Sequence, residues 1–73
     1  MPTPPSTSIE KALDLLITLG ELGGSSGLQA LAERAGVPKS SAHRLLQSLA
    51  SRGLVSRTSD GDYQLGSALV VLG

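Results

Sequence analysis

The sequence predicts a mostly α-helical chain with a small β-hairpin, and three observations support this fold class. Apolar residues recur at helical spacing in three separate segments. A Gly-Val-Pro sequence at 36–38 provides a short connection between the second and the third of them. An Asp-Gly pair at 60–61 lies between two strand-like runs and is a strong hairpin signal. Together these features predict a winged helix-turn-helix: a three-helix core, a wing and the start of a C-terminal linker helix.

The composition is that of one small domain without a site for a metal or a cofactor. The chain has 73 residues, no Cys and one His, so we expect neither a disulfide framework nor a structural zinc ion. Its first residues lack the basic and apolar stretches of a signal peptide, and no apolar run reaches membrane-spanning length. These features fit a cytoplasmic protein.

Basic side chains are concentrated in the middle of the sequence, although the formal net charge is zero. No acid lies between Glu33 and Asp60, and most of the Lys and Arg residues lie in that interval. These residues are Arg34, Lys39, Arg44, Arg52 and Arg57. Such segregation can produce a basic face that binds phosphate on an otherwise neutral molecule. A solvated helix surface could carry the same charges, so the charge pattern alone is weak evidence for binding to nucleic acid.

Residues 1–7 are expected to be a disordered N-terminal arm, because Pro, Ser and Thr dominate them. Thr7 and Glu10 have the spacing of a capping box, so the first helix should begin near Ser8. Its apolar residues cover an unusually wide face: Ile9, Ala12, Leu13, Leu15, Leu16, Leu19 and Leu22. We therefore expect this helix to be the central core helix and also to pack partly against another subunit or domain.

A glycine- and serine-rich segment at 23–27 is expected to be a flexible loop. It lacks the Lys-Ser/Thr pair of a nucleotide-binding P-loop, so nucleotide binding is not expected. The second helix should start at Gln29 or Ala30 and continue to Ala35. Gly36 should end it, because glycine readily takes the left-handed conformation found at helix C-termini.

The third helix, predicted at 38–52, carries the most functional information. Its apolar residues share one side: Ala42, Leu45, Leu46 and Leu49. The opposite side and its edges carry the polar residues Lys39, Ser40, Ser41, His43, Arg44, Gln47, Ser48 and Ser51. Arg can pair with guanine, Gln with adenine, and Ser with a base or a phosphate. Such a helix can pack on a core and place its outer side in the major groove of DNA.

The segment 54–65 is predicted to form the wing, because two strand-like runs flank the turn signal at Asp60 and Gly61. A two-residue turn there would pair Tyr63 with Thr58. Since a hairpin alone is unstable, it should lie against the helices. The residues then placed on its core face are Leu54, Tyr63 and Leu65.

Two wing residues are expected to approach DNA. Arg57 would share the outer face with Gln64 and offer a charge to phosphate, and Gly61 would let the backbone come close to a neighbouring surface. Residues 68–72 are apolar, and the segment 67–73 resembles the start of a helix that leads out of the domain. The domain itself is therefore expected at 8–66, either as part of a longer protein or paired through this end.

No arrangement of residues predicts catalysis. His43 has no Cys to activate, and the nearest acids lie outside its helix. Asp60 and Asp62 are most simply turn residues. Tyr63 is the only aromatic residue, so the chain lacks a stacking platform for single-stranded nucleic acid. We therefore expect a protein that is not an enzyme and that has double-stranded DNA as its partner.

Two stretches of the sequence are specific enough to compare with known families. They are Gly-Val-Pro-Lys-Ser-Ser-Ala-His-Arg-Leu-Leu at 36–46 and Tyr-Gln-Leu-Gly at 63–66. With the order of helices around them, the chain from Ser8 onward resembles the N-terminal domain of IclR-type bacterial transcription regulators. The resemblance implies a winged helix-turn-helix whose third helix reads the major groove of a palindromic operator. The implied DNA-contacting residues are Lys39, Ser40, Ser41, His43, Arg44 and Gln47.

The resemblance also implies partners outside this domain. Homodimers would form through the first helix and the helix after the wing. A C-terminal domain, missing from this chain, would bind a small effector, often a carbon-metabolism intermediate or an aromatic compound, and the regulator would be a repressor. The sequence departs from the family at Asp62, where a basic residue is common, and at Gln29, which replaces the usual Ser or Thr cap of the second helix.

Two other interpretations remain open. Small-molecule O-methyltransferases carry a similar winged-helix module that serves dimerisation without DNA contact, and a winged helix can also bind another protein. The wide apolar face of the first helix fits either the DNA-binding or the dimerisation interpretation. The acid-free outer side of the third helix favours DNA, because a pairing module needs no Lys, Arg, Gln and Ser there.

Overall fold

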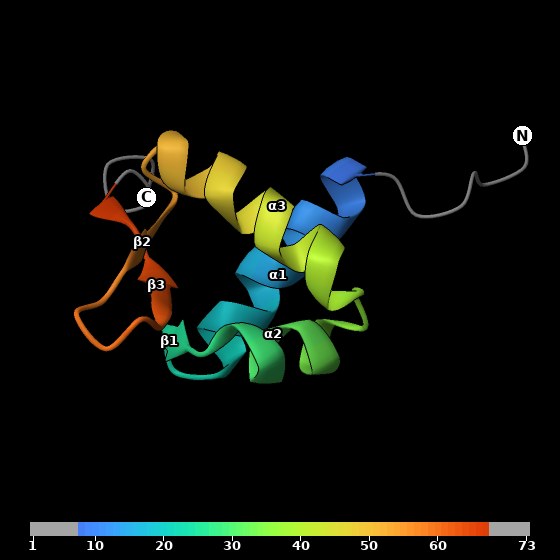
Figure 1. Ribbon diagram of the computed structural model, residues 1–73, viewed down its shortest axis with the longest axis horizontal. Coiled ribbons are helices and arrows are strands. Elements are labelled where there is room, and N and C mark those ends of the chain that lie inside the picture. Colours follow the sequence, from blue (N-terminus) through green and yellow to red (C-terminus); the bar gives the residue numbers. More distant parts are fainter. Residues whose placement is uncertain (1–7, 68–73) are drawn as a thin grey trace, which may run out of the picture.

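The computed structural model describes residues 8–67, which form three helices and a small antiparallel sheet around one core (Figure 1). The helices are α1 (Ser8–Glu21), α2 (Leu28–Ala35) and α3 (Lys39–Ser51). The strands are β1 (Ser25–Ser26), β2 (Val55–Arg57) and β3 (Tyr63–Leu65). The expected arm at 1–7, with Thr7, and all but the first residue of the expected linker helix at 67–73 lie outside the described residues.

The core lies where the helices meet the sheet. Its most deeply buried side chains come from all three helices and from both wing strands: Leu15, Leu19, Leu31, Ala42, Leu46, Val55 and Tyr63. α1 contacts α2, α3 and the sheet, and its buried Leu15 and Leu19 are one helical turn apart. α1 is therefore the central core helix, as the sequence predicts.

α1 also carries an apolar stripe that faces away from this core. Ile9, Leu13 and Ile17 are 72%, 51% and 60% exposed. They are four residues apart, so they line one side of the helix. We call these three residues the outer stripe. Packing of the outer stripe against another subunit stays a prediction.

The turn between α2 and α3 has the geometry that Gly36 predicts. Gly36 has a φ of 71°, and its N–H donates to the Glu33 carbonyl at 3.2 Å. The Val37 N–H donates to the Ala32 carbonyl at 3.0 Å, which completes a Schellman motif. Val37 is buried, and the Pro38 carbonyl accepts the first hydrogen bond of α3 at 2.8 Å. This tight connection sets the orientation of α3 relative to α2.

The segment expected to be a flexible loop contains a strand, so that expectation is wrong. Ser25 and Ser26 form β1 and pair with Gln64 and Tyr63 of β3, which gives the strand order β1-β3-β2. The physical reason is that β3 would otherwise leave the backbone groups of one edge unpaired. The pairing also attaches the wing to the segment that precedes α2.

α2 begins at Leu28, slightly earlier than predicted, and Gly27 occupies its cap position. Gln29 is therefore inside the helix, and the expectation that it stands at the cap is wrong. Its side-chain amide donates to Glu33 Oε1 at 3.3 Å, one turn further along. Within the described chain, Gly27 provides no side-chain hydrogen bond to the first turn of α2.

The turn and the register of the wing differ from the prediction. The turn is longer, because the Gly61 N–H donates to the Thr58 carbonyl at 3.0 Å and Gly61 itself is left-handed, with a φ of 88°. The partner of Tyr63 is consequently Arg57 and not Thr58. This shift of one position moves Arg57 to the face of Tyr63 and away from Gln64.

The buried residues of the wing change with the register. Val55 and Tyr63 are buried, whereas Leu65, which was expected in the core, is 38% exposed. On the other face, the Gln64 side-chain amide donates to Ser56 Oγ at 3.2 Å. The prediction for Leu65 is wrong: Leu65 remains on the face of Tyr63 and pairs with Val55, but of these two partners only Val55 is buried.

Candidate nucleic-acid interface

α3 presents one apolar side to the core and one polar side to solvent. Ala42, Leu46 and Leu49 are buried, and Leu45 packs partly against the core. The exposed polar residues are Lys39, Ser40, His43, Arg44, Gln47, Ser48 and Ser51. Ser41 is half-buried at the edge of this side. The division predicted from helical spacing is confirmed, because helical phase follows directly from the 3.6-residue repeat.

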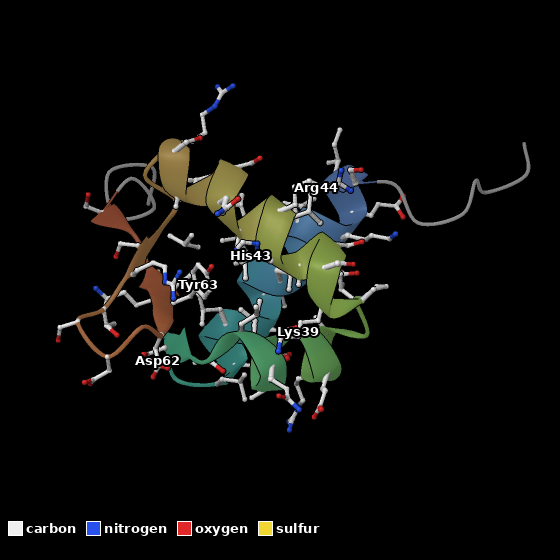
Figure 2. All side chains as sticks on the ribbon, in the orientation of Figure 1. Lys39, His43, Arg44, Asp62 and Tyr63 are labelled. Carbon is white, nitrogen blue, oxygen red and sulfur yellow. The ribbon has the colours of Figure 1, made fainter. Side chains whose placement is uncertain are left out.

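The long polar side chains of α3 have no partners inside the molecule. Among residues 8–67, no hydrogen bond, ion pair or ring contact is made by the side chains of Lys39, His43, Arg44 and Gln47. Figure 2 shows Lys39, His43 and Arg44 projecting from α3. Their donors and acceptors are available to an external ligand, and base edges and phosphates are groups that such side chains bind.

The amino end of α3 is open as well. Pro38 precedes the helix with a ψ of 141° and, in the described chain, provides no side-chain cap. The first-turn amides of Lys39 and Ser40 have no acceptor within the helix, as at the start of every α-helix. Both residues are exposed. Together with the helix dipole, these amides favour an anion such as phosphate.

The wing places Arg57 differently from the prediction. Its side chain is exposed, but it does not stand beside Gln64 as a free charge. Arg57 Nη2 donates to the Gly61 carbonyl at 3.0 Å, and Cζ lies 4.8 Å from the centre of the Tyr63 ring. Gly61 is half-buried at the tip. The two wing residues expected to approach DNA are thus in contact with each other.

Asp62 has a position that its turn-like sequence did not predict. It is half-buried and lies beside Gly27, because the register of β1 and β3 continues to this pair. A Cβ atom added to Gly27 would be 3.5 Å from Asp62 Oδ1. The carboxylate therefore lies near the amino end of α2, where the helix dipole is positive. Only the pairing of β1 with β3 creates this contact, so no local sequence signal could have revealed it.

The polar side of α3 does not join a cluster that could bind a metal. Within residues 8–67, no group of His, Asp and Glu side chains is arranged to hold a metal ion. In that same range His43 makes no hydrogen bond or ion pair with an acid. No helix of the described chain is both long enough and apolar enough to cross a membrane.

Comparison with known proteins identifies relatives for most of the chain. Residues 8–59 match a family model described as the IclR helix-turn-helix domain. The acetate operon repressor of Salmonella typhimurium is 34% identical over 67 residues, which are 90% of this chain and 24% of that protein. The chain therefore spans about a quarter of the length of the curated relatives it matches.

Solved structures show the same fold. HmgR from Pseudomonas aeruginosa has a TM-score of 0.84 and 37% identity, over 90% of this chain and 28% of that chain. An IclR homolog complexed with 4-hydroxybenzoate, from Microbacterium hydrocarbonoxydans, has a TM-score of 0.83 and 25% identity, over 92% of this chain and 28% of that chain. These matches confirm the fold class predicted from the sequence.

Proposed function

This chain belongs to the family of IclR helix-turn-helix domains, the DNA-binding domains of transcription regulators, and we propose that it reads a duplex operator through the polar side of α3. One observation carries the proposal. The long side chains on that side are exposed and lack partners among residues 8–67, and no acid accompanies them. A surface of this kind suits the base edges and phosphates of a major groove.

The residues of the site would have different roles. Arg44 and Gln47 would contact base edges, because each can make two hydrogen bonds to a single base. The residues that flank them and reach phosphates or neighbouring bases would be Lys39, Ser40, Ser41 and His43. Phosphate contacts would set the position of α3 on the duplex, and base contacts would set its sequence preference.

The wing would lie on the DNA backbone or in the minor groove through Arg57 and Gly61. The exposed guanidinium of Arg57 supports this role. Asp60 and Asp62 in the same hairpin repel phosphate, so we expect the wing to contribute less affinity than α3.

We further propose that the complete protein is a homodimer that binds a palindromic operator. The outer stripe supports this, because three large apolar side chains are exposed together on α1. The helix expected after the wing would complete the interface. Two copies related by a twofold axis would place their α3 helices one turn of DNA apart.

The complete regulator would be a cytoplasmic repressor that responds to a small molecule through a domain outside this chain. The support comes from relatives, one of which is named as a repressor and another of which is complexed with 4-hydroxybenzoate. An aromatic acid is therefore the first class of effector to test.

Binding to duplex DNA tests the proposal. The affinity for a mixed-sequence duplex should fall steeply as salt is raised, because phosphate contacts release counterions. Selection from a random duplex library should then yield a palindromic consensus. The dimerisation module of a methyltransferase, the alternative considered from the sequence, would show neither result. The matches reported above are to regulators and lend that alternative no support.

A further inference from the structure

We propose that Arg57 is the positioning residue of the wing: it holds the hairpin tip in one shape and presents its own charge from a fixed place. This goes beyond the role of a free phosphate-binding charge that the sequence predicts. The structural part of the proposal stands on the isolated chain, and its consequence for affinity rests on the proposed binding of DNA.

The ring of Tyr63 provides the fixed surface for Arg57. The two residues are directly opposite each other in the β2–β3 register, and Arg57 Cζ lies 4.8 Å from the ring centre. Tyr63 is only 1% exposed, so its ring is held by the core. A guanidinium over an aromatic face is attracted by the ring quadrupole. Arg57 is consequently attached to a part of the molecule that does not move with the tip.

The second attachment is to the tip itself. Arg57 Nη2 donates to the Gly61 carbonyl at 3.0 Å, and a Cβ added to Gly61 would be only 3.6 Å from the same nitrogen. The tip is otherwise closed by backbone bonds between Thr58 and its partners Gly61 and Asp62, and by one bond to the Thr58 hydroxyl. One guanidinium therefore joins β2, the tip and the buried ring of β3.

The arrangement leaves Arg57 able to bind DNA without releasing the tip. A guanidinium has five N–H donors in a planar fork, and the Gly61 carbonyl uses one of its nitrogens. The side chain is exposed, so the remaining donors can reach a phosphate. Lys would keep the charge but would lose the planar fork that both stacks and bonds. Arg57→Lys therefore distinguishes a positioning role of Arg57 from a role that needs only its positive charge.

Nuclear magnetic resonance of the DNA-free chain tests the attachment. The parent should show the Cδ protons of Arg57 shifted upfield by the ring current of Tyr63, the only Phe, Trp or Tyr residue of the chain. The Gly61 amide signal should move in Arg57→Met and Arg57→Lys. It should stay in place in Arg52→Met, the matched control at an exposed arginine of the α3 end. The proposal would be overturned if the Arg57 Cδ protons are not shifted upfield, or if the Gly61 amide signal keeps its chemical shift in both Arg57 variants.

Affinity for a mixed-sequence DNA duplex tests the consequence. Arg57→Lys should bind about two- to fivefold more weakly than the parent, because the wing is no longer ordered before binding by an exposed cation–π contact and must be ordered on the DNA. Its salt dependence should be unchanged because the charge is the same. Arg52→Lys should bind like the parent. If Arg57→Lys also binds like the parent, Arg57 acts as a charge alone and the positioning role is refuted. A parent that binds no duplex would instead refute the proposed function, while the resonance experiment would still decide the attachment.

Discussion

Arg44 and Leu46 stand two positions apart on α3 and have opposite environments. Leu46 is fully buried, whereas Arg44 is exposed and makes no contact within residues 8–67. Two positions turn a helix by about 200°, which is why neighbours in sequence fall on opposite sides. Residues on the polar side should therefore affect DNA binding and leave the free energy of unfolding almost unchanged.

The substitution Arg44→Ala should weaken binding to a selected operator by about 1–3 kcal/mol and relax the preference at one base pair. The reason is the loss of a paired contact to a base edge. Titration against the operator and its single-base variants measures both effects. Arg34→Ala, on the exposed face of α2, is the control and should keep the preference at every position. If Arg44→Ala binds the operator and each of its single-base variants with the same relative affinities as the parent, Arg44 does not contact a base.

Gly66 occupies a place that no side chain can share. A Cβ there would be 2.1 Å from the Gly53 carbonyl oxygen and 2.9 Å from the carbonyl carbon of Leu54. Because these are backbone atoms, the clash cannot be relieved by a change of rotamer. Gly66→Ala should lower the free energy of unfolding by about 3 kcal/mol through overpacking, as denaturant titration would show.

Gly20→Ala is the matched control for that substitution. Gly20 is exposed in α1, and a Cβ there would meet no heavy atom of the described chain within 4 Å. Alanine should stabilise the helix by about 0.5–1 kcal/mol, because it loses less backbone entropy than glycine. Equal effects of the two substitutions would show that the close approach at Gly66 has no energetic importance.

At the scale of elements, the wing and α2 are linked by the sheet. β1 leads directly into α2 and pairs with β3, so the wing is held against the amino end of that helix. The link brings a carboxylate to a helix start at which Gly27 provides no side-chain cap within the described chain. We therefore expect Asp62, an acid that would oppose phosphate binding, to stabilise the start of α2.

Asp62→Asn should lower the free energy of unfolding by about 0.3–1 kcal/mol at low salt, because a charge near the positive end of α2 is removed. Asp60→Asn removes the same charge from the exposed tip of the hairpin and should have almost no effect. Thermal denaturation of both variants, at low and at high salt, measures the difference. The proposed role of Asp62 fails if the two variants unfold alike at low salt.

At the scale of the whole molecule, α1 has more apolar surface than the domain buries. Leu15 and Leu19 are inaccessible to solvent, yet the outer stripe on the same helix is more than half exposed. Exposed apolar patches of this kind are common at interfaces between subunits. The part of the wide apolar face of α1 that the domain leaves exposed is therefore the outer stripe.

Replacing Leu13 and Ile17 together by Gln should shift the proposed dimer toward monomer in analytical ultracentrifugation. Both side chains are exposed in the single chain, so the substitution should leave the circular dichroism spectrum unchanged. Leu65→Gln, at an exposed apolar position on β3, is the control and should not change the association. A dimer that survives the double substitution would place the interface elsewhere.

The parts of this protein that follow from local chemistry could be predicted from the sequence. The phase of α3 depends only on spacing along one helix, so the exposure of Arg44 and Gln47 was correctly anticipated. The turn before α3 depends on the left-handed conformation that Gly36 readily takes. Roles on DNA for these side chains remain predictions, because contact with a ligand depends on the partner as well as on the chain.

Local sequence is enough to predict the three helices, their buried and exposed sides and the tight turn between α2 and α3. The third strand, the register of the wing, the stacking of Arg57 on Tyr63 and the place of Asp62 beside α2 depend on the folded domain. The two groups of features differ because of the sequence separation between the residues that form them. A helix is specified by residues three or four positions apart, whereas β1 and β3 pair Ser25 with Gln64 and are joined only when the whole domain folds.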